Sequence, residues 1–220
     1  MISFILPIRN EARSIERAIS SILNQNNINQ GFEILIADGM SNDGTREIIQ
    51  SFSEKKYSIN LIDNPEQIVA NGFNRALSIA RGDYIIRVDG HSEINQDFIT
   101  NCMKQFEYSD AECVGGPTNH VGSGIIGNAI TIAQSSKFGV GGATFRECVH
   151  QGRYVDTLAF GAYKREVFEK NGGYDEEFVR NQDDEFNFRL IQSGGKIWLD
   201  PSIKSTYYPR DSLSKLFKQY

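Results

Sequence analysis

Four short apolar segments alternate with helical patterns in the first ninety residues, and this alternation limits the possible folds more than any other feature. Apolar residues at helical spacing, such as Ile15, Ala18, Ile19 and Ile22, mark the helices. The strands are expected at residues 2–6, 32–37, 59–62 and 83–88, and the helices near 15–23, 45–52 and 67–81. Alternation of this kind predicts right-handed βαβ units, a parallel sheet and hence an α/β fold.

Polar residues follow the ends of these strands. Asn10 and Glu11 follow the first, Asp38 follows the second and Asp89 follows the fourth. Ligands of parallel sheets bind beyond the carboxyl ends of the strands, so we expect these side chains to converge on one crevice. Asp89 and His91 flank Gly90 and can together bind a divalent cation, although an acid in an Asp-Gly turn and a structural histidine are the alternatives.

Composition restricts the partners and the compartment. The net charge of -5 argues against nucleic acid, although a local cationic cleft for phosphates stays open. Three cysteines without CxxC spacing predict reduced thiols and an intracellular protein. Neither a signal peptide nor an apolar run of membrane-spanning length is visible in the sequence.

The second half has a weaker pattern. Helices are expected near 98–106, 164–170 and 182–194, and strands at 112–116, 157–161 and, as the last one, 196–199. Residues 115–152 are rich in glycine and predict a mobile or ligand-ordered segment. A GxGxxG match at 122–127 is discounted, because it does not follow a clear strand. The chain stops within a basic amphipathic pattern, so we expect it to be part of a longer protein.

The carboxylates indicate the kind of chemistry. Asp38, Asp89 and Asp183 follow strands or open a helix, and the chain has neither Ser/His/Asp spacing nor a cysteine poised beside a histidine. This set suits an enzyme that uses a metal ion and a general base.

Five motifs resemble those of family 2 glycosyltransferases of the GT-A fold, in order and spacing over nearly the whole chain. They lie at residues 7–11, 37–45, 74–84, 88–91 and 182–183. The resemblance implies a Rossmann-like, mostly parallel central sheet flanked by helices. It also implies a single catalytic domain over 1–220, with a nucleotide-binding half (1–92) and an acceptor-binding half (93–220).

The resemblance also implies roles for residues at the strand ends. Asp38 would accept a hydrogen bond from a pyrimidine base, with a turn or N-cap role as the equal alternative. Arg75 would approach phosphate or merely lie on a helix surface. Asp89 and His91 occupy the DxD position, where His91 replaces the final acid and moves the expected ion from Mg²⁺ toward Mn²⁺. The nucleotide-binding set is Pro7, Ile8, Asn10, Glu11, Asp38, Asn74, Arg75 and Asp89.

Asp183 matches the family's general base, and Gln182 stands where the family has a glutamate. Gly161 and Ala162 match the small residues beneath the donor sugar. The implied reaction is inverting transfer of a sugar from a nucleotide diphosphate donor, expected to be UDP, to a glycan or lipid-linked acceptor. The QxxRW motif of processive members is absent from the sequence, so repeated polymerisation is not supported.

Two other classes stay open. A non-catalytic nucleotide-sugar binding module would keep Asp38 and tolerate loss of Asp183. A nicotinamide oxidoreductase would need a glycine fingerprint where residues 7–11 stand, which disfavours it. More narrowly, residues 88–92, 138–142 and 181–185 are similar to bacterial succinoglycan-type glucosyltransferases. That similarity implies work at the inner face of the cytoplasmic membrane, with membrane segments beyond residue 220.

Overall fold

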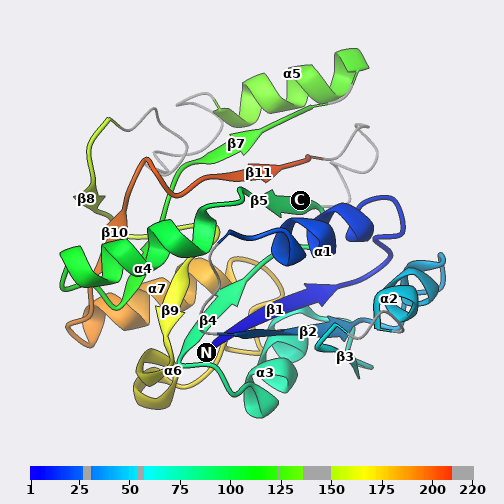
Figure 1. The fold of residues 1–220 in the computed structure, drawn as a ribbon, viewed down its shortest axis with the longest axis horizontal. Helices are drawn as coiled ribbons and strands as arrows, with labels where there is room; N and C mark the ends of the chain where they lie inside the picture. The colour runs from blue at the N-terminus through cyan, green and yellow to red at the C-terminus, as the bar shows by residue number, and fades with distance from the viewer. Residues whose placement is uncertain (27–30, 54–56, 123, 136–149, 210–220) are drawn as a thin grey trace.

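The computed structural model describes residues 1–26, 31–53, 57–122, 124–135 and 150–209 (Figure 1). In its first half, strands and helices alternate as expected. The elements are β1 (Ile2–Ile8), α1 (Ile15–Leu23), β2 (Phe32–Asp38), α2 (Thr45–Ser53), β3 (Ile59–Asp63), α3 (Val69–Ile79) and β4 (Tyr84–Arg87). Strand β1 pairs in parallel with β2 and β4, and β2 pairs in parallel with β3.

The second half adds more strands than the sequence predicted. Its elements are β5 (Ser92–Ile94), α4 (Phe98–Tyr108), β6 (Cys113–Gly115), β7 (Thr118–His120), α5 (Gly124–Ser135), β8 (Arg153–Tyr154), β9 (Ala162–Lys164), α6 (Arg165–Asn171), α7 (Gln182–Gln192), β10 (Ile197–Leu199) and β11 (Ser205–Tyr207). The expected strand at 157–161 is wrong, because the strand begins at Ala162. Leu158 and Phe160 are buried from an irregular segment, and their alternation imitates a strand.

Two further expectations for this half fail in part. The glycine-rich stretch contains β7 and the helix α5, and residues 136–149, including Cys148, lie outside the described part. The strand at 196–199 is not the last, because β11 follows it. Cys102 and Cys113 are buried free thiols, as predicted.

The described strands form one large sheet and one small sheet. The large sheet has the order β3-β2-β1-β4-β9-β6-β10-β8, with β9 antiparallel to both of its neighbours. The small sheet has the order β5-β11-β7, and Figure 1 shows it to one side of the large sheet, with α5 beyond β7. The mostly parallel α/β architecture is therefore confirmed.

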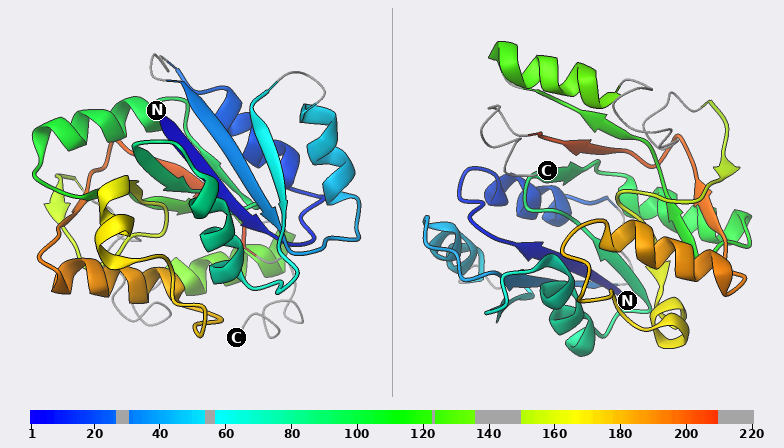
Figure 2. Two further views of the ribbon diagram at one scale, coloured as in Figure 1. Left: turned by 90° about the horizontal axis from the view of Figure 1, so that it is seen from below. Right: turned by 180° about the vertical axis from the view of Figure 1, so that it is seen from behind.

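Helices cover both faces of the large sheet (Figure 2). Alternate residues of β1 and β2 enter two separate cores, as the two-residue period of a strand requires. Phe4 and Ile34 pack with α1, α2 and α4, whereas Ile5 and Leu35 pack with α3, α6 and α7. The sheet is thereby fixed between two apolar layers, and its carboxyl edge stays open to polar side chains.

Strand β1 extends past the expected stop at Pro7. Pairing with β2 continues, since Ile8 O accepts from Gly39 N at 2.8 Å, whereas Val88 N bonds to Ile5 O on the β4 side at 3.0 Å. Successive residues of β1 point their backbone N–H and C=O groups alternately to β2 and to β4, so the missing N–H of Pro7 falls on the β4 side. The pairing of β1 with β4 ends before Pro7, at Ile5 and Arg87. Proline is tolerated there, and β1 and β4 diverge beside it.

Candidate functional site

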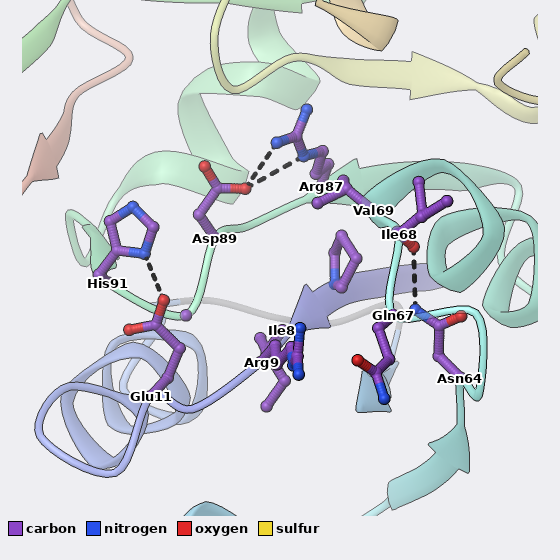
Figure 3. A pocket seen from close by; sticks show the side chains of 12 residues that line it. Ile8, Arg9, Glu11, Asn64, Gln67, Ile68, Val69, Arg87, Asp89 and His91 are labelled. Carbon is purple, nitrogen blue, oxygen red and sulfur yellow. Dashed lines mark hydrogen bonds and ion pairs between the residues drawn. The ribbon is translucent and has the colours of Figure 1, made fainter. Parts of the chain in front are cut away.

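A cavity of about 180 Å³ opens at the carboxyl ends of β1 and β4 (Figure 3). Five residues expected at the crevice line it, namely Pro7, Ile8, Glu11, Asp89 and His91. The remaining lining residues are Arg9, Asn64, Gln67, Ile68, Val69, Arg87 and Gly90. Of the four side chains expected to converge, Glu11 and Asp89 therefore line the cavity and Asn10 and Asp38 do not, while the roles of all four stay predictions.

Gly90 allows the loop after β4 to approach the loop after β1. A Cβ atom at this position would lie 2.9 Å from Glu11 Cγ and 2.9 Å from Ile8 Cγ2. Such distances are too short for carbon atoms, so a larger residue would push the two loops apart. The glycine thereby sets the spacing between Asp89 and His91 on one side and Glu11 on the other.

Asp89 is held by Arg87, the last residue of β4. The Nε and Nη2 atoms of Arg87 donate to Asp89 Oδ1 at 3.1 and 2.9 Å. Both donors use one oxygen, so Oδ2 takes no part in this pair. The side chains are 10% and 19% exposed. Burial alone would lower the pKa of Arg87, but the charges of Asp89 and Asp183 outweigh it and raise the pKa.

His91 is oriented by Glu11. The distance from His91 Nδ1 to Glu11 Oε1 is 2.8 Å, and Glu11 Oε2 accepts from Ser14 Oγ at 2.8 Å (Figure 3). A carboxylate only accepts, so Nδ1 carries the proton and the lone pair of the neutral ring lies on Nε2. Metal-binding histidines commonly donate their second nitrogen to a carboxylate in this way. The His91 ring also lies edge-on to Tyr207, with centroids 4.9 Å apart.

Asp183 approaches the same arginine from the other side. It lies in the first turn of α7, after Asn181 with a left-handed φ of 57°. Its Oδ2 is 3.4 Å from Arg87 Nη1, and its side chain is 28% exposed. Burial raises the pKa of Asp183; Arg87 opposes the rise, and the charges of Asp184 and Asp89 add to it. A carboxylate with a raised pKa is a better proton acceptor near neutral pH.

Asp38 does not line the cavity. Its side chain is fully buried, accepts from Ser41 N at 2.9 Å and from Ser41 Oγ, and pairs with Arg46 at 2.8 Å. Asn10 joins the same turn, since its backbone N donates to Ser41 Oγ at 2.7 Å and its Oδ1 accepts from Asn42 N at 3.0 Å. The described contacts of Asp38 match its turn role, and its contact with a base stays a prediction.

Asn74 and Arg75 also lie outside the cavity lining. Asn74 bonds both the N–H and the C=O of Tyr174 at 2.8 Å, so it connects α3 to the loop after α6. Arg75 forms an exposed ion pair with Glu66 at 2.6 Å. Their nucleotide-binding roles therefore have no support from position and stay predictions.

Gly161, Ala162 and Gln182 are buried away from the cavity lining. A Cβ on Gly161 would lie 2.6 Å from Cys113 Sγ. Close packing against Cys113 is therefore enough to require glycine here, whether or not a donor sugar lies above it. Gln182 is 5% exposed at the start of α7, directly before Asp183. Their expected contacts with donor or acceptor remain untested.

Sequence reasoning missed several lining residues, namely Arg9, Asn64, Gln67, Ile68, Val69 and Arg87, and among them Arg87 contacts both Asp89 and Asp183. A signal was present, because an arginine ends the apolar run Tyr84–Arg87, and a buried arginine needs an acidic partner. Asp89 was the obvious partner at two residues' distance. The second acid, Asp183, comes from a helix that local patterns do not relate to β4.

Sequence comparison relates this chain to sugar-transferring enzymes. The family described as Glycosyl transferase family 2 matches residues 3–172. The succinoglycan biosynthesis protein ExoA of Rhizobium meliloti (strain 1021) is 34% identical over 218 residues, which are 98% of this chain and 66% of that protein. A dolichyl N-acetyl-alpha-D-glucosaminyl phosphate 3-beta-D-2,3-diacetamido-2,3-dideoxy-beta-D-glucuronosyltransferase of Methanococcus voltae is 30% identical, covering 99% of this chain and 70% of that protein. This chain thus spans about two thirds of these relatives.

Solved structures share the fold at low identity. Staphylococcus aureus TarS 1-349 in complex with UDP-GlcNAc has a TM-score of 0.72 at 16% identity, over 96% of this chain and 59% of that one. The mannosyltransferase PcManGT of Pyrobaculum calidifontis, in complex with GDP-Man and Mn²⁺, has a TM-score of 0.70 at 18% identity, over 93% and 56%. These likenesses confirm the expected GT-A fold. In the described part of the chain, no helix has the length and apolar character needed to span a membrane.

Proposed function

Because this chain belongs to glycosyl transferase family 2, we propose that it transfers one sugar from a nucleoside diphosphate donor to a hydroxyl group of a glycan or lipid-linked acceptor, with inversion. The observation that carries the mechanism is the meeting of Asp89 and Asp183 at Arg87 beside the cavity. Asp89 belongs to the donor side, and Asp183 is the candidate base. An inverting transfer needs one carboxylate to deprotonate the acceptor hydroxyl, and the donor-side acid would hold the metal ion that carries the diphosphate.

The donor is proposed to be a UDP-sugar bound at the cavity between β1 and β4. TarS, which shares the fold, was solved with UDP-GlcNAc, whereas PcManGT was solved with GDP-Man, so the base must be tested directly. Arg9 and Gln67 bring a guanidinium and an amide donor to the cavity, whereas Arg87 is paired with Asp89 and Asp183, and Asn64 Nδ2 already donates to Ile68 O. A guanidinium and an amide donor suit diphosphate oxygens, and a bound divalent cation would offset the charges of Glu11 and Asp89 in the same lining.

A divalent cation fits the donor atoms at Asp89 and His91. Arg87 bonds Asp89 Oδ1, so Asp89 Oδ2 would be the first metal ligand. His91 Nδ1 bonds Glu11, so the lone pair on His91 Nε2 would be the second. Within the described ranges, no group of three or more acidic, histidine or cysteine residues forms a metal site. Two protein ligands suit an ion completed by diphosphate oxygens. Nitrogen from His91 favours Mn²⁺ over Mg²⁺.

Asp183 is proposed to act as the general base. Its carboxylate takes the proton of the acceptor hydroxyl while the acceptor oxygen bonds to the anomeric carbon and the bond from that carbon to the diphosphate oxygen breaks. The bound cation would stabilise the negative charge that develops on the departing diphosphate. Arg87 holds Asp183 beside the donor side, and its positive charge favours the ionised carboxylate that accepts the proton.

The biological setting rests on the relatives. The name of the succinoglycan biosynthesis protein supports a role in exopolysaccharide assembly, and the name of the Methanococcus voltae transferase, whose acceptor is a dolichyl phosphate saccharide, supports a lipid-linked acceptor. The proposed place of action is the cytoplasmic side of the membrane, with membrane contact through residues beyond 220.

The proposal is tested by calorimetric titration with UDP and with GDP, each with and without Mn²⁺, together with UDP release from a panel of UDP-sugars. Asp183→Asn should leave UDP affinity nearly unchanged and slow turnover by about 10²–10⁴-fold. The matched control is Asp184→Asn, since Asp184 is exposed and bonds Thr157 Oγ1 at 2.6 Å. Binding of UDP without turnover by the wild-type chain would instead indicate a nucleotide-sugar binding module.

A further inference from the structure

Arg87 contacts both acids of the proposed mechanism through different nitrogens. Nε and Nη2 donate to Asp89 Oδ1, while Nη1 faces Asp183 Oδ2 at 3.4 Å. We infer that Arg87 is a positioning residue that joins the donor-side acid and the base into one ion-paired unit and fixes the distance between them. This inference rests on the proposed function for its catalytic half, whereas its structural half stands on the contacts alone.

The incomplete bonding of Nη1 distinguishes this arginine from an ordinary buried ion pair. Within the described residues, Nη1 is buried without a hydrogen-bond partner, although it points toward Asp183. A buried donor without a partner costs free energy, so a shorter distance between Nη1 and Asp183 Oδ2 would be energetically favourable. The guanidinium is planar, so Asp89 and Asp183 are held in a defined relative orientation.

The elements around the arginine restrict its movement. Arg87 ends β4, where Ile85 and Ile86 are fully buried, and its side chain is 10% exposed. Tyr174 interacts with the same guanidinium and is itself stacked on Phe73 with ring centroids 4.1 Å apart. An arginine confined in this way can orient the two carboxylates, because it has little freedom to turn away from either.

The consequence concerns geometry at the anomeric carbon. The donor-side acid and the base must lie on opposite sides of the reacting atom, and small misplacements of such groups cost about 100-fold in rate. A lysine would retain the charge but not the fork that contacts two carboxylates at once. Arg87→Lys and Arg87→Met therefore separate charge from geometry.

The experiment compares these two variants with Arg189→Met, measuring thermal unfolding, UDP affinity and kcat. Arg189 is the matched control, because it forms a partly buried ion pair with Glu185 on α7 and touches neither acid. Arg87→Met should lower the Tm by about 10 °C and kcat by about 100-fold, with UDP affinity changed less than about tenfold. Arg87→Lys should regain most of the Tm, while kcat stays at least about tenfold low.

A double-mutant cycle tests the ion-paired unit without any turnover. In the Arg87→Met background Asp183 lacks its counter-charge, so Asp183→Asn should be more favourable there than in the wild type. The change in Tm caused by Asp183→Asn should be more positive by about 2 °C in that background. Additive Tm values would overturn the inference, whatever the activity of the wild type.

The kinetic outcomes are equally decisive. An equal loss of kcat in Arg189→Met, or full recovery of kcat in Arg87→Lys, would overturn the positioning role. A wild-type chain that binds no nucleotide and releases no UDP would instead overturn the proposed function and the catalytic half of the inference with it.

Discussion

The pair formed by Glu11 and His91 allows the proposed metal site to be tested apart from catalysis. Glu11 accepts a hydrogen bond at each carboxylate oxygen, from His91 Nδ1 at Oε1 and from Ser14 Oγ at Oε2, both at 2.8 Å. Glu11→Gln keeps an oxygen for His91, so the ring orientation survives, whereas the negative charge and the acceptor of the Ser14 hydroxyl are lost. Glu11→Ala removes both bonds and leaves His91 free to turn.

The magnitudes follow from this difference. Loss of a carboxylate behind a metal-binding histidine weakens metal affinity about 10–100-fold. We expect Glu11→Gln at the lower end and Glu11→Ala at the upper end, or about 1.4 and 2.8 kcal/mol. The alanine variant should also lose about 2–4 kcal/mol of unfolding free energy, because two buried hydrogen bonds to a charged group disappear.

The assay is calorimetric titration of Mn²⁺ into the protein with saturating UDP, repeated for UDP without metal. Glu16→Gln is the matched control, because Glu16 is an exposed glutamate in the first turn of α1. If the Glu11 variants bind Mn²⁺ as the control does, the pair is structural and the reasoning fails. If metal-free UDP binding weakens equally, Glu11 contacts the nucleoside and does not act through His91.

Three further predictions concern titration and reactivity. Because the pKa of Asp183 is raised by burial, turnover should fall as the pH drops through a value above the ordinary aspartate range, and a pH profile of kcat/KM checks this. Burial favours a higher pKa of Glu33, but hydrogen bonds from Arg81 and Ser3 outweigh it and lower the pKa. The stabilisation should therefore be fully present above the ordinary glutamate pKa of about 4.3 and be lost as the pH falls through the lower pKa of the folded state, and Glu33→Gln should flatten the acid limb of unfolding free energy against pH. Burial raises the pKa of Cys102 and Cys113, so these two of the three thiols should resist a disulfide reagent until denaturant unfolds the chain.

Local patterns predicted those elements whose burial repeats along the chain. Strands β1 to β4 and helices α1 to α3 have clear apolar periods, and their core positions are buried as expected. The same method placed a strand at 157–161 and missed α5. Leu158 and Phe160 alternate in burial without strand pairing, and Gly124 and Gly127 in the first turn of α5 conceal its helical period. Periodicity reports burial, and burial does not always imply regular structure.

The candidate site divides in the same way. Pro7 and Ile8 end β1, whereas Glu11, Asp89 and His91 follow strand ends, and parallel pairing of β1 with β4 brought all five to one cavity. Asn74 and Arg75 had the right sequence neighbourhood, yet they bond to Tyr174 and Glu66 outside that cavity. Motif position therefore predicted which loops meet, but not which side chain within a motif faces the ligand.

The sequence by itself determined the parallel α/β order, the acids that end its strands and the resemblance to family 2 glycosyltransferases, because apolar periodicity and motif spacing are local properties of the chain. Only the tertiary structure decided that Arg87 lies between Asp89 and Asp183 and that Glu11 orients His91. The contacts of Arg87 with Asp183 and of Glu11 with His91 join residues far apart in sequence. Asp183 reaches Arg87 because the tertiary fold brings the start of α7 to the end of β4, and the pair is favoured because an unpaired buried charge is costly. Neither the packing of α7 against β4 nor this cost can be read from a local sequence pattern.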